Sequence, residues 1–139
     1  MVKVDNYEIP DDLHYSTDFE WAKKENGKVR IGITDYAQKQ LREVVYVELP
    51  AAGSTLTQNV PYGTVESVKA VSDLIAPVSG TIEEINTEVQ NKPELLNEDP
   101  YNKGWLLLVK PTNLDAELKN LMDTPKSIEW HRNLIAKGK

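Results

Sequence analysis

The sequence contains no cysteine and only two histidines among its 139 residues. Without cysteine the chain can form no disulfide, no thiolate nucleophile and no sulfur ligand for a metal. His14 and His131 lie far apart and follow no metal-ligand spacing. We therefore interpret both as surface or packing residues. We expect neither a metal site nor a Ser/His/Asp site, because no nucleophile-elbow sequence is present.

Long apolar runs, phosphate-binding loops and basic clusters are also missing. The longest purely apolar run covers residues 105–109, far too few for a membrane span. No glycine-rich loop ends in Lys-Ser or Lys-Thr. The net charge is −6, which argues against a nucleic-acid partner. Acids stand where a signal peptide would need its apolar stretch, so we expect a cytoplasmic protein with no membrane partner.

What the chain does have is a length that fits one domain and a 40% apolar content that can fill a core. Residues 19–24 and 29–33 alternate apolar and polar side chains around Asn26-Gly27, which predicts a β-hairpin. A short helix is predicted next, with Thr34 as its N-cap. We interpret the polar residues 1–13 as an extended arm.

Further short strands are predicted at 44–49, on both sides of a turn near residue 69, at 81–85 and at 105–109. A helical turn is predicted at 93–97. Helical periodicity follows Pro111, and a last helix is predicted from Ser127. The pattern favours a mainly β fold, a small sandwich or barrel at 14–111, with C-terminal helices at 112–139 packed on the same domain.

Lys69 stands between two of the short strands. Taken alone, it is best interpreted as an ordinary exposed hairpin lysine. The nearby acids Glu66, Asp73, Glu83 and Glu84 are best interpreted as a solvated acidic face rather than as an acid–base pair. A lysine on a rigid turn can also serve as an amide attachment point for a carboxylic-acid cofactor.

Four blocks favour the second interpretation. They are "GITDYAQKQL" (32–41), "VVYVELP" (44–50), "VESVKAVSDLIAPVSG" (65–80) and "NEDPYNKGW" (97–105). In this order and spacing the chain resembles the H protein of the glycine cleavage system, over roughly residues 14–123. "YSTDFEW" (15–21) is similar to the N-terminal block of that family.

The resemblance implies a lipoyl/biotinyl-domain-like barrel-sandwich hybrid of two antiparallel sheets, with lipoate bound covalently to Lys69. It implies a carrier, not an enzyme, because the cofactor supplies the reactive disulfide. The carrier would take an aminomethyl group from the glycine decarboxylase P protein to the aminomethyltransferase T protein. Dihydrolipoyl dehydrogenase would reoxidise the arm, and a lipoate ligase or lipoyl transferase would attach it.

The resemblance also implies roles for residues around the lysine. Glu66, Ser67, Val68 and Ala70 would form the turn that a lipoyl-attaching enzyme recognises. By position, Glu20 would lie in a cleft that protects the loaded arm and would pair with its amine.

Three features depart from the family pattern and put the protective cleft in question. Phe19 replaces the usual histidine, Arg42 replaces the usual glycine, and "GSTLTQNVPYGTV" (53–65) is atypical.

Other interpretations remain open at this stage. An H-like carrier for lipoate relay, or for another lipoate-dependent pathway, would have the same lysine block. A lipoyl domain of a 2-oxo acid dehydrogenase fits less well, because Asp-Lys-Ala is common there. A biotin carrier would have methionines where Val68 and Ala70 stand. A module with an unmodified lysine is the alternative from a different class.

Overall fold

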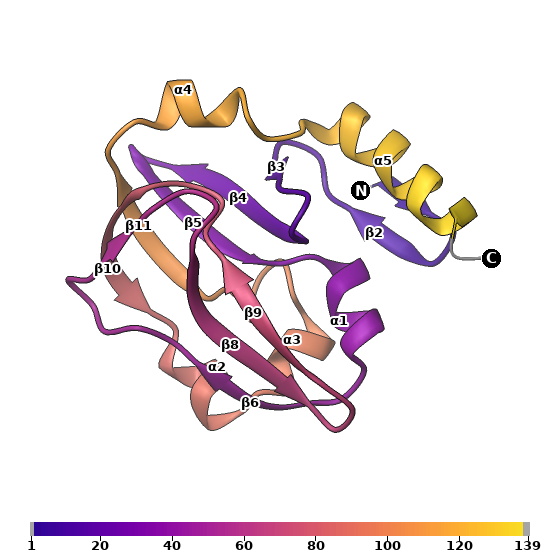
Figure 1. Cartoon of the computed structure of the whole chain (residues 1–139), viewed down its shortest axis with the longest axis horizontal. Coiled ribbons are helices and arrows are strands. Elements are labelled where there is room, and N and C mark those ends of the chain that lie inside the picture. Colours follow the sequence, from indigo (N-terminus) through magenta and orange to yellow (C-terminus); the bar gives the residue numbers. More distant parts are fainter. Residues whose placement is uncertain (1, 138–139) are drawn as a thin grey trace.

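Figure 1 shows a computed structural model that describes residues 2–137 and is built mainly from antiparallel β-strands. The larger sheet has six strands, which in spatial order are β3 (His14–Tyr15), β4 (Glu20–Glu25), β5 (Lys28–Ile33), β11 (Leu107–Pro111), β10 (Gly80–Ile85) and β7 (Thr55–Leu56). A three-stranded sheet has the order β6 (Val44–Glu48), β8 (Pro61–Ser67) and β9 (Val71–Ile75). The prediction of a mainly β fold with two antiparallel sheets is confirmed.

The two larger sheets enclose one apolar core. Strand alternation places Val29 and Ile31 of β5 inward from the six-stranded sheet. Val47, Val65 and Leu74 enter the same core from β6, β8 and β9. All five side chains are buried, so this shared core holds the sandwich together.

The predicted hairpin and the helix after it are both present. Asn26 and Gly27 have φ angles of 50° and 80°, the left-handed conformation that a two-residue hairpin turn requires. The helix α1 (Asp35–Leu41) follows β5 directly. The Thr34 hydroxyl accepts a hydrogen bond of 3.2 Å from the backbone N–H of Ala37, as expected for an N-cap.

The N-terminal segment is not the extended arm that its polarity predicted. Residues 2–9 form a hairpin of β1 (Val2–Val4) and β2 (Tyr7–Ile9), which packs against the last helix, α5 (Thr124–Lys137). Figure 1 shows α5 lying alongside this hairpin. Ile9 is fully buried in a second apolar cluster with Trp21. A few apolar residues, such as Ile9, are enough to pack this polar segment against the rest of the protein. Its composition alone did not reveal this packing.

Four helices differ in detail from the prediction. The helix α2 (Thr87–Asn91) was not predicted; the Asn86 side chain caps it by accepting from Glu88 N–H at 3.2 Å. The short helices α3 (Leu95–Glu98) and α4 (Leu114–Leu118) stand near their predicted places. α5 begins at Thr124, before the predicted Ser127, because Pro125 is tolerated in a first helical turn.

Candidate functional site

Lys69 lies in the tight turn that connects β8 to β9, and its side chain is exposed. The turn is closed by a hydrogen bond of 2.8 Å from Ser67 N–H to the carbonyl of Ala70. The buried Ser67 hydroxyl oxygen also accepts from the backbone N–H groups of Ala70 at 3.2 Å and Lys69 at 3.4 Å. The fold therefore fixes the backbone of Lys69 while its amine remains in solvent.

The turn is also supported from the neighbouring strand. Val68 N–H donates to the carbonyl of Glu43 at 3.2 Å, and Val44 pairs with Ser67. Glu66 is exposed on β8, directly before Ser67. The sequence-predicted group of Glu66, Ser67, Val68, Lys69 and Ala70 thus forms one compact, supported turn.

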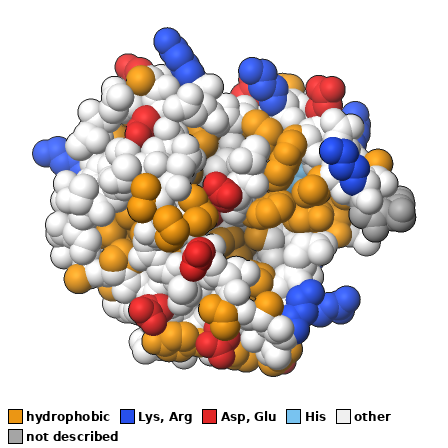
Figure 2. All heavy atoms as spheres, viewed as in Figure 1, with side chains coloured by type: hydrophobic (Ala, Val, Ile, Leu, Met, Phe, Trp, Pro, Cys, Tyr) orange, Lys and Arg blue, Asp and Glu red, His pale blue; other side chains and the backbone are white. Residues whose placement is uncertain are grey.

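A cleft of about 260 Å³ lies beside this turn. Its walls come from α1, from β9 and from the segment that enters β4. The residues that line it include Lys69, Ala70, Asp73, Leu74, Tyr36, Gln40, Asp18, Phe19 and Glu20. Figure 2 shows apolar side chains around a hollow near the centre of this face, with acidic side chains next to it. A flexible chain attached to Lys69 would start at the edge of this cleft.

Glu20, singled out from the sequence, is almost completely buried at 1% exposure. The Tyr62 hydroxyl donates to its Oε1 atom at 2.7 Å. Its Oε2 atom has no hydrogen-bond partner among residues 2–137. Burial raises the pKa of Glu20 well above its ordinary value. The hydrogen bond from the Tyr62 hydroxyl opposes this increase only in part, as does the nearby Ile75 backbone, which does not reach hydrogen-bond geometry with Oε2. The cleft wall therefore holds a buried carboxyl group whose charged form a nearby cation would favour.

The aromatic wall of the cleft contains Phe19, one of the departures from the family pattern. Its ring stacks on that of Tyr36 with centroids 5.4 Å apart and contacts Trp130 of α5 at the same centroid distance. Its φ angle is 69°, and its carbonyl accepts from Thr34 N–H at 2.9 Å. The cleft is present despite this departure, with an aromatic ring in its wall.

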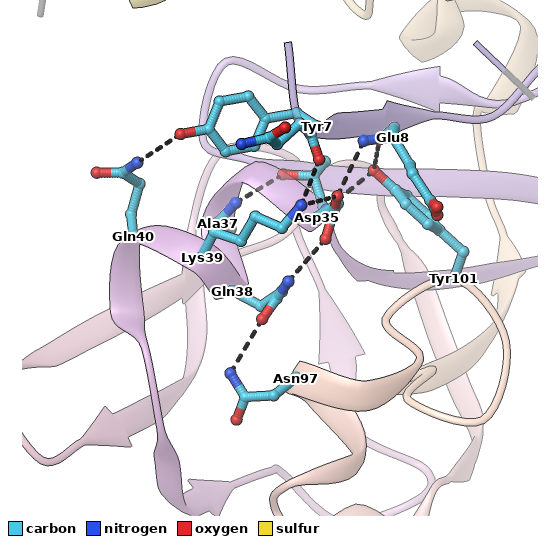
Figure 3. A network of polar contacts seen from close by, with 11 residues as sticks. Tyr7, Glu8, Asp35, Ala37, Gln38, Lys39, Gln40, Asn97 and Tyr101 are labelled. Carbon is cyan, nitrogen blue, oxygen red and sulfur yellow. Dashed lines mark hydrogen bonds and ion pairs between the residues drawn. The ribbon is translucent and has the colours of Figure 1, made fainter. Parts of the chain in front are cut away.

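A polar network fixes α1, the helix that supplies part of this wall (Figure 3). Asp35 is buried, and its Oδ2 atom accepts from Glu8 N–H of the N-terminal hairpin at 2.9 Å. Its Oδ1 atom accepts from the Gln38 side chain at 2.7 Å. The Tyr101 hydroxyl accepts from Asp35 N–H at 2.9 Å and donates to the Glu8 carbonyl at 2.6 Å. The N-terminal hairpin and the loop after α3 therefore hold α1 in place.

The second departure, Arg42, ends α1 in an unfavourable backbone conformation. Its φ and ψ angles are 66° and −139°, in a region that glycine adopts far more easily. Asn97 supports the segment, because its side chain donates to the Arg42 carbonyl at 2.5 Å and accepts from Val44 N–H at 2.9 Å. Arg42 thus has a backbone conformation that favours glycine, and the Asn97 side chain supports the chain on both sides of Glu43.

Sequence reasoning did not assign several residues of the cleft, among them Asp18, Tyr36 and Asp73. The helical spacing of Tyr36 and Gln40 was the available signal, because residues four apart lie on the same face of α1. Asp73 was seen only as part of a general acidic face.

Among the described residues no group of histidine, cysteine, aspartate and glutamate could hold a metal ion. None of the helices in residues 2–137 combines the length and apolar character of a membrane span.

Comparison with known proteins gives a consistent result. The sequence model of the family described as "Glycine cleavage H-protein" matches residues 13–133. A probable glycine cleavage system H protein of Pyrococcus horikoshii is 47% identical over 135 residues, which covers 96% of this chain and all of the relative. A glycine cleavage system H protein of Geobacillus thermodenitrificans is 50% identical over 113 residues, covering 81% of this chain and 88% of the relative.

A solved structure agrees with the sequence relatives. The crystal structure of a glycine cleavage system H protein from Mycobacterium marinum superposes with a TM-score of 0.79 at 38% identity. The match covers 90% of this chain and 99% of that one. The barrel-sandwich fold expected from the resemblance is therefore confirmed.

Proposed function

Because this chain belongs to the glycine cleavage H-protein family, the non-catalytic lipoyl carriers of the glycine cleavage system, we propose that Lys69 is its lipoyl attachment site. The observation that carries the proposal is the position of Lys69 on a tight turn beside a cleft. The amine makes no ion pair among the described residues. The turn of residues 66–70 would be recognised by a lipoate ligase or lipoyl transferase.

A lipoyl group supplies a disulfide that accepts an aminomethyl group, which a protein without cysteine cannot supply itself. The role of this chain is to position the attachment point. The backbone hydrogen bonds of Ser67 fix the turn, and the exposed Lys69 side chain leaves the arm free to reach its partners. Tethering raises the effective concentration of the arm at each docked enzyme.

We propose that the carrier receives the aminomethyl group of glycine from the P protein and delivers it to the T protein. Dihydrolipoyl dehydrogenase would restore the disulfide. The cleft supports a further role for Glu20 between these steps. Its unpaired Oε2 atom would accept a hydrogen bond from the amine of the loaded arm, and the cation would favour the carboxylate form.

The test uses the lipoylated protein with purified P protein, glycine and labelled bicarbonate. The proposal predicts exchange of label into the glycine carboxyl group, and no exchange with Lys69→Arg as the carrier. Arginine keeps a positive charge but cannot be acylated in place of the amine. A fully lipoylated protein that supports no exchange would instead favour an H-like carrier in lipoate relay or another lipoate-dependent pathway.

A further inference from the structure

An exposed apolar patch surrounds the base of Lys69. Five large hydrophobic side chains are strongly exposed in the part of the chain that the structure describes, and four of them lie around the β8–β9 turn. These four define the outer patch, with exposed fractions of 44% for Val45, 50% for Tyr46, 66% for Val68 and 64% for Val71. The fifth, Val60, precedes β8 at its opposite end. Exposed apolar residues that gather in this way mark an interaction surface.

Strand pairing places the patch on the outer face of the three-stranded sheet. Tyr46 of β6 is paired with Glu66 of β8, and Glu66 is paired with Val71 of β9. Directly paired residues point to the same side of a sheet. Val65, the neighbour of Glu66, is buried in the core, so the row of Tyr46, Glu66 and Val71 faces solvent.

A β-bulge adds the second β6 side chain to the patch. The pairing of β6 with β8 shifts between Val44 and Tyr46, where one extra residue is inserted. Regular alternation would turn one of Val45 and Tyr46 inward, whereas here both are exposed. The Asn97 side chain, which accepts from Val44 N–H, holds the bulge. The exposure is therefore a property of the local backbone and not of chance side-chain positions.

The charged residues on the strands of this face are all acidic. A second cross-strand row contains Glu48, Thr64 and Asp73, next to the row that contains Glu66. The strands β6, β8 and β9 contain no lysine or arginine. Figure 2 shows acidic and apolar side chains together over the region of these strands. Such a surface complements a partner with an apolar centre and a basic rim.

We propose that the outer patch is the docking surface of the enzyme that acylates Lys69, an inference that rests on the proposed lipoylation. In that step the amine attacks the carbonyl carbon of a lipoyl adenylate. The N–C bond forms, the bond from carbon to the phosphate oxygen breaks, AMP leaves and the nitrogen loses a proton to solvent. Before acylation only the short lysine stem extends from the turn, so the enzyme must cover the residues beside it. Enzymes that use the long loaded arm can bind further away.

The experiment measures acylation of the whole protein by a purified lipoate–protein ligase with lipoate and ATP. Tyr46→Thr and Val71→Thr are compared with wild type, and Val60→Thr is the matched exposed control. The initial rate of acylation is measured by intact mass spectrometry, and thermal melting confirms that each variant is folded. Val71→Thr is a conservative change, because threonine keeps a β-branched side chain suited to a strand. We expect kcat/KM to fall about tenfold for the patch variants, as for central apolar interface residues, and to stay within about twofold for Val60→Thr.

Acylation of the patch variants at the wild-type kcat/KM, or an equal loss in Val60→Thr, would overturn the inference. Added salt should raise the KM of wild type, since charge attraction between the partners is screened. After long incubation to full acylation, the patch variants should support glycine–bicarbonate exchange like wild type. An equal loss of exchange would assign the patch to the decarboxylase and contradict the inference. Failure of wild type itself to be acylated would instead remove the proposed function.

Discussion

The Tyr62 hydroxyl on β8 donates a hydrogen bond of 2.7 Å to the Oε1 atom of Glu20 at the start of β4, and this bond joins the two large sheets. The Oε2 atom of the same carboxyl group has no hydrogen-bond partner among residues 2–137. Burial raises the pKa of Glu20, and it also raises the pKa of Tyr62, with a further contribution from the neighbouring carboxyl group. A buried acid with one unpaired oxygen costs stability in the free carrier and is suited to receive a cation.

Glu20→Gln should therefore change the pH dependence of stability. The folded-state pKa of Glu20 lies above its ordinary value of 4.5, so above pH 4.5 the unfolded chain loses a proton that the folded protein retains. Stability of wild type then falls as pH rises from 4.5 towards the raised pKa. Between pH 4 and pH 7 the variant should therefore gain stability steadily relative to wild type in urea unfolding, because glutamine has no proton to lose. A difference between the two proteins that does not vary with pH would contradict this.

Arg42→Gly should stabilise the protein. At φ 66° and ψ −139° an arginine is strained, and glycine removes that strain at some cost in unfolded-state entropy. We expect a net gain of about 1 kcal/mol in the free energy of unfolding. Asn59→Gly is the matched control, because Asn59 has φ 69° but asparagine tolerates a positive φ better. Loss of stability in Arg42→Gly, measured by chemical denaturation, would show that the arginine is not strained.

Tyr101→Phe tests the network that fixes α1. Removing the hydroxyl leaves Asp35 N–H and the Glu8 carbonyl without their hydrogen bonds. The loss should be about 1–3 kcal/mol, the cost of buried groups left unpaired. Tyr46→Phe removes an exposed hydroxyl and should change stability by less than about 0.5 kcal/mol. Equal unfolding midpoints for both variants would show that the network is not important for stability.

Ser67→Ala tests the support of the lysine turn. The Ser67 hydroxyl oxygen accepts from the backbone N–H groups of Lys69 and Ala70, and the side chain is buried. Its loss should cost about 1 kcal/mol and increase hydrogen exchange at those two amides. Ser72→Ala on β9 is the control and should leave this exchange unchanged. Unaltered protection in Ser67→Ala would mean that the backbone alone holds the turn.

The sequence predicted much of the fold because its local signals were strong. Asn26-Gly27 indicated the hairpin, and Thr34 indicated the start of α1; both are as expected. The N-terminal hairpin was missed because its stability comes from packing Ile9 against distant residues, not from local periodicity. The helix α2 was missed because five residues carry too little periodicity, and only Asn86 signalled it.

The candidate site was predicted in part. The resemblance to the H-protein family indicated Lys69 and Glu20, and both residues line one cleft in the structure. Tyr36 and Asp73 lie at the same cleft, although they are far apart in sequence. The bulge at Val45 could not be predicted either, since the strand pattern of β6 alone does not reveal where its pairing with β8 shifts. Such features depend on which strands become neighbours.

Peptide mapping after acylation tests the central proposal most directly. Wild type and Lys69→Arg are incubated with lipoate, ATP and a purified lipoate–protein ligase, digested and analysed by mass spectrometry. The account predicts a single lipoyl adduct, on the wild-type peptide that contains Lys69, and none on the variant, which should melt at the same temperature because Lys69 is exposed. An adduct on another lysine, or no adduct on a folded wild-type protein, would contradict it.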